Sequence, residues 1–302
     1  MYKSFLKLIC KNRIIFIFDE KYLILTNPML KNKKLFIFDI DGTLCTGTKE
    51  PIQSGIRAVQ KLRSLGKQVV FLTNNSSKSR ESYKKLLSQF GISCEIKDIF
   101  TSGYLTSNIL SDLYPSANIF VIGEEGLISE LKLEGFKILN DEFPEIENSE
   151  SIPTECIADL VVVGWDRKVT FNKFRTAMIL IKNGAKFYAT NDDASFPAPN
   201  NQQWPGTGAI IAFLSTAINK KPENIFGKPN PEGTLSILSI NNTLPNEAVL
   251  IGDRLNTDIL GGNRAGITTI AVETGINNRQ DLLKAPKEQH PTYFFTNLDE
   301  LL

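Results

Sequence analysis

The sequence predicts an α/β protein with a doubly wound, Rossmann-like parallel sheet as its core and a second α/β domain inserted into that core. Two observations predict this class. Short apolar runs that end in polar residues alternate with segments of helical periodicity, which is typical of a parallel sheet covered by helices on both faces. The same alternation starts again in the middle of the 302 residues, which indicates a second sheet with its own core.

The core elements come from both ends of the chain. Two of the expected helices stop at Gly66 and Gly91, where glycine commonly ends a helix. The expected strands of the core are residues 35–38, 69–72, 249–251 and 268–272, and its expected helices are residues 52–65, 79–90 and 258–264.

The middle of the chain has enough elements for a domain of its own. A helix over 208–218 returns the chain to the core, and the acidic, proline-containing stretch 143–154 is expected to be a loop. The other expected strands are 118–122, 136–139, 159–163 and 186–190, and the other helices are 124–133 and 170–183. The chain therefore divides into an N-terminal extension (1–32), a first core part (33–112), an inserted domain (113–223) and a second core part (224–302).

The N-terminal extension contains an echo of the first core strand. Phe-Ile-Phe-Asp at 16–19 repeats Phe-Ile-Phe-Asp at 36–39, but it lacks the second aspartate and the glycine that follow Asp39. We expect either an extra edge strand or a disordered extension here, and no second site.

Composition excludes several classes of function. The net charge of +1 provides no global field for nucleic acid or an anionic membrane, so we expect neither as a partner. The longest apolar run near the N-terminus, 14–18, is too short for a membrane span or a signal-peptide core. The four cysteines form no CxxC pair and fit a reducing compartment, so a cytoplasmic location is expected. The chain has one histidine, His290, which excludes a multi-histidine metal cluster. His290 also lies in no recognisable motif of a catalytic triad.

Polar residues gather where the expected strands end, and parallel sheets bind ligands beyond that edge. Two of these carboxylates suit phosphate-ester hydrolysis. Asp39 would be ionised at neutral pH, because an ordinary Asp titrates near ~3.9, and would attack phosphorus to form an aspartyl-phosphate. Asp41, in a tight loop opened by Gly42, can protonate the leaving group and then deprotonate water. Mg²⁺ held by Asp39, the Asp41 backbone carbonyl and Asp253 would offset the repulsion between these carboxylates and a phosphate.

The other polar residues have supporting roles in this interpretation. Lys228 would pair with the nucleophile and with the phosphate. Thr73 and Asn74 would donate hydrogen bonds to phosphoryl oxygens, and Asn75 would either contact the phosphate as well or shape the loop through hydrogen bonds. Asp258 would orient Lys228 or a water on the metal from outside the metal's own ligand shell.

This ordered set resembles the four motifs of haloacid dehalogenase (HAD) superfamily phosphatases: DxDGT at 39–43, Thr-Asn at 73–74, the lysine of GKP at 227–229, and GDxxxxD at 252–258. The stretches FLTNNSSKSR, ATNDDASFP, GTG, GKPNPE and GDRLNTDILGG resemble the branch that holds 4-nitrophenylphosphatases, phosphoglycolate phosphatases and pyridoxal phosphatases. The resemblance covers about residues 33–302. It implies a HAD-like core and identifies the inserted domain as a cap that sets substrate choice.

The resemblance also implies a Mg²⁺-dependent phosphomonoesterase for small phosphorylated metabolites, with 4-nitrophenyl phosphate as a substrate in vitro. Arg167 and Lys168 could meet a substrate carboxylate, which favours a phosphoglycolate-like compound, or could be exposed surface charge. Phe196 stands where pyridoxal phosphatases of this branch place a histidine, which argues against pyridoxal phosphate. A homodimer, if one forms, is expected through the cap.

Two other functions stay open. A phosphotransferase or mutase of the same superfamily would share all four motifs and differ only in whether water or a hydroxyl group accepts the phosphoryl group. A catalytically silent relative would act as a binding module, but it would have lost one of Asp39, Asp41, Lys228 and Asp253, and all four are present.

Overall fold

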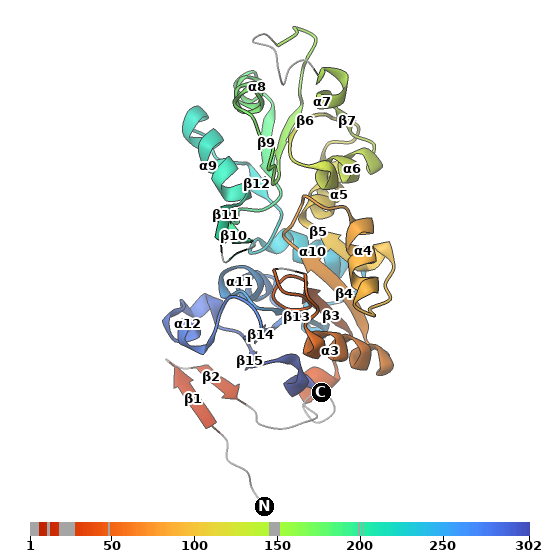
Figure 1. Cartoon of the computed structure of the whole chain (residues 1–302), viewed down its shortest axis with the longest axis vertical. Helices are drawn as coiled ribbons and strands as arrows, with labels where there is room; N and C mark the ends of the chain where they lie inside the picture. The colour runs from red at the N-terminus through yellow and green to blue at the C-terminus, as the bar shows by residue number, and fades with distance from the viewer. Residues whose placement is uncertain are drawn as a thin grey trace, which may run out of the picture. The chain divides into compact units, whose positions relative to one another are not determined.

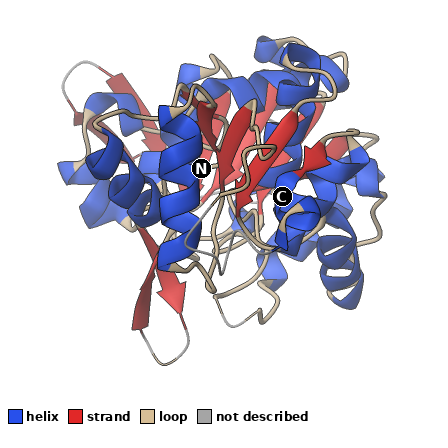
Figure 2. Ribbon diagram, turned by 90° about the horizontal axis from the view of Figure 1, so that it is seen from above, coloured by secondary structure: helices blue, strands red, loops and turns tan. Residues whose placement is uncertain are grey.

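A computed structural model of the chain describes residues 6–10, 13–17, 28–47, 49–144, 152–198, 200 and 202–302. Helices (blue in Figure 2) flank strands (red), as the sequence predicts. Within the described residues, no helix is both long enough and apolar enough to cross a membrane. The chain forms two compact units, of which the first comprises Met1–Leu72, Lys84–Ile99 and Lys228–Leu302 and the second Thr73–Tyr83 and Phe100–Gly227.

The main sheet has the strand order β1-β2-β15-β14-β13-β3-β4-β5 among the described residues (Figure 1). Neighbours from β2 to β4 pair in parallel, and β1–β2 is an antiparallel hairpin. Every residue of β3 and β13 is buried, which explains the apolar sequence of β13 and of β3 up to Phe38. The strands are β1 (Leu6–Cys10), β2 (Arg13–Ile17), β3 (Leu35–Asp39), β4 (Gln68–Thr73), β5 (Ile99–Thr101), β13 (Ala248–Gly252), β14 (Thr268–Val272) and β15 (Tyr293–Phe295).

The helices beside this sheet confirm the expected ones to within one or two residues at either end, except near residue 258. In α3, Ile56, Val59 and Leu62 follow the helical period and are buried. The helices are α2 (Pro28–Lys31), α3 (Gln53–Ser64), α4 (Arg80–Gln89), α10 (Pro231–Ile240), α11 (Leu260–Arg264) and α12 (Arg279–Lys284). The segment expected as one helix over 258–264 consists of a π-helical turn, Leu255–Ile259, followed by α11.

The second unit is built on a parallel sheet with the order β12-β9-β8-β6-β7. Alternate residues of its strands enter two separate apolar cores: Phe120 and Val161 pack with α8 and α9, whereas Val121 and Val162 pack with α5 and α6. Both faces are therefore covered, as in the main sheet. The elements are α5 (Ser102–Leu113), β6 (Asn118–Ile122), α6 (Glu125–Leu133), β7 (Lys137–Ile138), α7 (Leu139–Glu142), β8 (Leu160–Val163), α8 (Phe171–Lys182), β9 (Lys186–Ala189), β10 (Ser195–Ala198), β11 (Gln202–Pro205), α9 (Thr207–Ile218) and β12 (Asn224–Ile225).

The prediction of a strand over 136–139 is partly wrong. The strand is limited to Lys137–Ile138, and Leu139 begins α7. The side chain of Asn140 explains the early exit. Its Oδ1 accepts the backbone N–H of Val121 at 2.8 Å, and its Nδ2 donates to the Val121 carbonyl at 3.1 Å. The side-chain amide thus forms the hydrogen bonds to the N–H and carbonyl of Val121 that a longer β7 would otherwise form.

The N-terminal segment adds two strands to one side of the main sheet, with β1 at the edge, which is the first of the two expectations for it. Phe16 of β2 lies opposite Tyr293 of β15. Asp19, the end of the sequence echo, lies outside the described residues, as does most of the expected loop over 143–154.

Candidate active site

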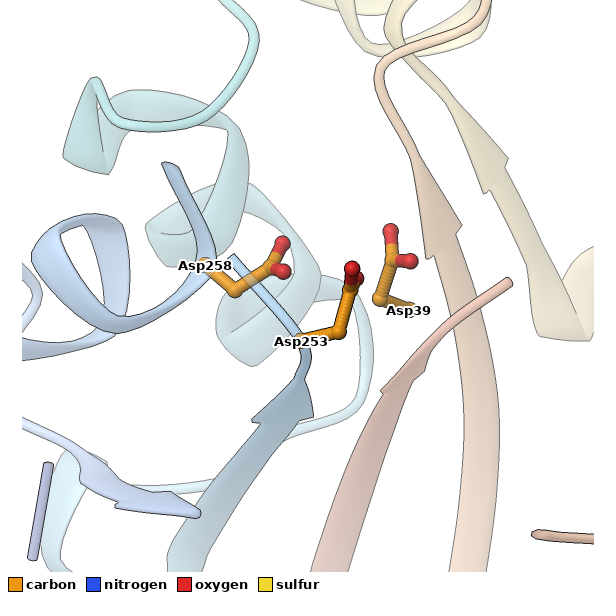
Figure 3. A group of neighbouring side chains, drawn as sticks. All are labelled: Asp39, Asp253 and Asp258. Atoms are coloured by element: carbon orange, nitrogen blue, oxygen red, sulfur yellow. The ribbon is translucent and has the colours of Figure 1, made fainter. Parts of the chain in front are cut away.

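Three aspartates lie together at the carboxyl edge of the main sheet (Figure 3). Asp39 is the last residue of β3, Asp253 directly follows β13, and Asp258 lies in the π-helical turn. One carboxylate oxygen from each lies within 4.8 Å of the other two. The strand register sets this arrangement, because Phe38 of β3 pairs with Ile251 of β13 and so brings the next residues of both strands level.

Two motif glycines make room for these carboxylates. Gly42 has a φ of +92°, and a Cβ there would lie 2.4 Å from Cγ of Asp253. A Cβ on Gly252 would lie 2.3 Å from Cγ of Asp258. Carbon atoms do not approach so closely, so the glycines of DxDGT and GDxxxxD are needed for the carboxylates to pack where they do.

Lys228 joins the cluster from the start of the segment that leads into α10. Its Nζ lies 2.5 Å from Oδ1 of Asp39 and 2.6 Å from Oδ1 of Asp258, and all three side chains are at least nine-tenths buried. Asp258 is fixed further by the backbone N–H of Arg254, which donates to its Oδ2 at 3.0 Å. Lys228 thus pairs with the predicted nucleophile, as the sequence interpretation requires, and also with Asp258.

Burial and mutual repulsion shift the pKa values in this cluster. Burial raises the pKa of Asp39 well above its ordinary value; Lys228 opposes the rise, and the charges of Asp258 and Asp253 add to it. Burial, together with the charge of Asp258, raises the pKa of Asp253 to about 7. Burial alone would lower the pKa of Lys228, but the carboxylates of Asp258 and Asp39 outweigh it and raise that pKa. The lysine therefore stays charged.

The cluster fits a divalent cation. Oδ2 of Asp253 accepts the backbone N–H of Ile276 at 2.7 Å, whereas its Oδ1 is buried without a hydrogen-bond partner in the part of the chain that the structure describes. Three buried carboxylates face one ammonium group, so ionisation leaves negative charge to be compensated. Hard cations such as Mg²⁺ and Ca²⁺ prefer carboxylate oxygens. The predicted ligands Asp39 and Asp253 are in the cluster, together with Asp258, which was expected outside the ligand shell.

Asp41 is not one of the three clustered carboxylates. Its Oδ1 accepts a short hydrogen bond from Nζ of Lys49, and the Cys45 thiol lies 3.8 Å from the same oxygen. The loop is closed by the N–H of Gly42, which donates to the Cys45 carbonyl at 2.7 Å, and by the Thr274 hydroxyl, which donates to the Gly42 carbonyl at 2.7 Å. Burial, helped by Asp41, raises the pKa of Cys45 to about 12, so its thiol is unreactive at neutral pH.

The predicted phosphate-contacting residues form a tight turn after β4. The hydroxyl of Thr73 accepts the backbone N–H of Asn75 at 3.1 Å. Oδ1 of Asn75 accepts both the N–H and the hydroxyl of Ser77 at 2.8 Å. The Asn75 side-chain oxygen therefore shapes the turn.

Asn74 belongs to the second unit and is fixed by three other residues of that unit. Its carbonyl accepts the Ser102 hydroxyl at 2.5 Å and Nδ2 of Asn191 at 2.8 Å. Its own Nδ2 donates to Oδ2 of Asp193 at 3.2 Å. Asn191 and Asp193 belong to the ATNDDASFP stretch, which repeats the Thr-Asn turn of 73–74 after another strand.

Sequence reasoning did not single out Lys49, Ser102 or Asp193 for these roles. The repeated Thr-Asn turn was a usable signal for Asp193. Lys49 and Ser102 stand in no motif. Only the folded backbone brings Lys49 to Asp41 and Ser102 to the carbonyl of Asn74.

Comparisons with known proteins identify the family of the chain. A family model described as haloacid dehalogenase-like hydrolase matches residues 36–137, and a HAD-hydrolase-like model matches residues 225–301. An acid sugar phosphatase of Staphylococcus saprophyticus is 32% identical over 273 residues, which cover 90% of this chain and 98% of that protein.

Two solved structures extend the likeness. A p-nitrophenyl phosphatase from Archaeoglobus fulgidus has a TM-score of 0.79 and 32% identity, over 89% of this chain and 98% of that one. A glycerol phosphate phosphatase from Mycobacterium tuberculosis, in complex with calcium, has a TM-score of 0.78 and 27% identity, over 90% of this chain and 76% of that one. The chain belongs to the haloacid dehalogenase superfamily, as a phosphatase of its 4-nitrophenylphosphatase branch.

Proposed function

We propose that the protein is a Mg²⁺-dependent phosphomonoesterase that hydrolyses small phosphorylated metabolites through an aspartyl-phosphate on Asp39. The observation that carries the proposal is the buried cluster of Asp39, Asp253 and Asp258, in which one ammonium group balances three carboxylates and one carboxylate oxygen of Asp253 has no partner within the described residues. Water is the proposed acceptor, in keeping with the phosphatase names of the relatives.

Each catalytic residue has a proposed task. Asp39 attacks phosphorus while Asp41 gives a proton to the leaving oxygen; Asp41 then takes a proton from the water that cleaves the aspartyl-phosphate. Lys228 favours the ionised form of Asp39, against the effect of burial, and neutralises charge on the phosphoryl oxygens. Mg²⁺ would be held by Asp39, the Asp41 backbone carbonyl and Asp253, and when bound it supplies positive charge for the phosphoryl group.

The other site residues support this chemistry. We propose that Asp258 keeps Lys228 in place through their ion pair. Thr73 and Asn74 donate hydrogen bonds to phosphoryl oxygens, and Asn75 holds the turn in shape for them. These roles follow from the buried pairings and from the chemistry of a phosphate dianion.

We propose sugar and polyol phosphates ahead of phosphoglycolate as substrates. Arg167, one of the two residues expected to meet a substrate carboxylate, is held by both oxygens of Glu124 at 2.8 and 2.6 Å, and its guanidinium lies 5.0 Å from the Trp165 ring. A guanidinium so engaged has little to offer a second carboxylate. The names of the relatives, acid sugar phosphatase and glycerol phosphate phosphatase, point in the same direction.

Three further assignments belong to the proposal. Residues 113–223 act as the cap between core parts 33–112 and 224–302. The location is cytoplasmic, a choice supported by free, buried thiols at Cys45, Cys94 and Cys156. A homodimer would form through the cap, where Phe171 and Phe213 are exposed; sedimentation of the purified protein tests this.

The experiment that tests the function is phosphate release from a set of phosphometabolites and from 4-nitrophenyl phosphate. Activity should vanish in EDTA and return with Mg²⁺, whereas Ca²⁺ should inhibit, because its larger and looser shell misplaces the nucleophile. Full activity in chelator would overturn the metal assignment. A preference for phosphoglycolate over glycerol and sugar phosphates would overturn the substrate assignment alone.

A further inference from the structure

The two aspartates of the DxDGT motif each have a lysine of their own. Lys228 pairs with Asp39 and is almost fully buried, with 3% of its side chain exposed. Lys49 pairs with Asp41, and these two side chains are 29% and 38% exposed. Asp39 and Lys228 are therefore largely buried, whereas the side chains of Asp41 and Lys49 are each about one-third exposed.

The backbone holds Lys49 in a fixed and unusual conformation. Its φ is +67°, in the left-handed region that is unfavourable for an ordinary L-residue. The N–H of Lys49 donates to the Thr46 carbonyl at 2.9 Å, and the N–H of Thr46 donates to the Glu50 carbonyl at 2.8 Å. The hydroxyl of Thr46 accepts the N–H of Glu50 at 3.1 Å. Strained backbone of this kind persists where the surrounding structure over-determines it, often at functional sites.

The ammonium group meets one specific oxygen of Asp41. Lys49 donates to Oδ1, and the Cys45 thiol lies on the same oxygen. No hydrogen bond reaches Oδ2 of Asp41 from the residues that the structure describes. A carboxyl group that shuttles a proton needs one oxygen held and the other available, because its efficiency depends on a defined position relative to the leaving group.

We propose that Lys49 is a positioning residue for Asp41: its ammonium group holds Oδ1, and Oδ2 is the oxygen that exchanges the proton. In the first step the Oδ2–H bond breaks and the proton goes to the leaving-group oxygen, as the bond from phosphorus to that oxygen breaks and the bond to Asp39 forms. In the second step Oδ2 takes a proton from water, whose oxygen bonds to phosphorus as the bond to Asp39 breaks. This inference rests on the proposed function of Asp41.

The test separates positioning from phosphate binding by the leaving group. Lys49→Met keeps the stem length and the backbone requirement but removes the charge. For glycerol phosphate, whose alkoxide needs a proton, kcat/KM should fall about 10- to 100-fold, whereas for 4-nitrophenyl phosphate it should fall less than about threefold. Lys49→Arg, which keeps a donor for Oδ1, should recover the glycerol phosphate value to within about fivefold. Lys84→Met, which removes a half-exposed lysine paired with Glu95, should leave kcat/KM unchanged for both substrates.

The double variant Asp41→Asn/Lys49→Met distinguishes the inference from the proposed function. If Lys49 acts through Asp41, adding Lys49→Met to Asp41→Asn should cost no more than about twofold for either substrate. Equal losses for both substrates in both backgrounds would mean that Lys49 binds the phosphate, and would overturn the inference. If Asp41→Asn alone shows no dependence on the leaving group, the proposed acid/base role fails first.

Discussion

The raised pKa of Asp253 predicts that the metal-free protein loses stability as the pH rises. A carboxyl whose folded pKa lies above its unfolded value binds its proton more tightly when folded. Its contribution to stability is therefore present below the unfolded pKa and is lost as the pH rises through the folded pKa. For Asp253 these limits are the ordinary value of 3.8 and about 7. Asp39, whose pKa is also raised, acts in the same direction.

The size of the effect follows from that difference. At about 1.4 kcal/mol for each pH unit, the rise in the pKa of Asp253 amounts to about 4 kcal/mol, of which about 3 kcal/mol is lost between pH 5 and pH 8. Few other groups should contribute to a change of stability between pH 5 and pH 8, because histidine is the side chain that ordinarily titrates there and His290 is the chain's one histidine. A bound divalent cation should remove the loss, because it favours the ionised carboxylate.

Urea unfolding followed by circular dichroism, at pH 5 and pH 8, with EDTA or with Mg²⁺, measures this. Asp253→Asn is the matched variant. Its amide oxygen can still accept the N–H of Ile276, while its NH₂ group can donate to the neighbouring carboxylates. We expect the metal-free variant to be more stable than the wild type at pH 8 and to gain little from Mg²⁺. A wild type equally stable at both pH values in EDTA would refute the charge argument, as would a variant that loses as much as the wild type.

Three further outcomes are expected. Asp39→Asn should reduce turnover more than a thousandfold (about 4 kcal/mol of barrier) with an unchanged circular dichroism spectrum; activity within tenfold of the wild type would exclude the aspartyl-phosphate. Gly42→Ala should lower the free energy of unfolding by about 2 kcal/mol or more and weaken Mg²⁺ binding measured by calorimetry. Gly66→Ala is the control: at φ +72°, with no atom within 4 Å of the added carbon, it should show the cost of the backbone conformation alone. Equal losses of stability for Gly42→Ala and Gly66→Ala would contradict the contact between a Cβ at position 42 and Asp253. Asp193→Ala removes the acceptor of the Asn74 amide and should lower kcat/KM about tenfold, at about 1.5 kcal/mol for a charge-assisted hydrogen bond; unchanged kinetics would show that this contact does not position the turn.

The sequence predicts best where a residue is tied to a strand end. Asp39, Asp253 and Thr73 follow buried apolar runs, so strand pairing alone brings Asp39 and Asp253 to one edge of the sheet. Lys228 and Asp258 could be recognised only with the help of their motifs, since neither ends a strand.

Side chains that act through loop closure could not be predicted in this way. Lys49 reaches Asp41 because its turn adopts a left-handed backbone, for which the sequence contains no glycine or asparagine signal at that position. Asn140 ends a strand early through two hydrogen bonds to Val121, a residue 19 positions away. Apolar periodicity contains no information about either contact.

The π-helical turn that carries Asp258 has a consequence for chain length. The N–H of Ile259 donates to the Arg254 carbonyl five residues earlier, so this turn contains one residue more than an α-helical turn would. Successive residues of a helix are about 100° apart around its axis. Deleting one residue between 255 and 257 would therefore rotate Asp258 by about 100° relative to Arg254 and β13. Either Asp258 would lose its ion pair with Lys228, or α11, with Leu260 in the core, would have to move. Insertions and deletions in this stretch should be far less tolerated than substitutions on its exposed face.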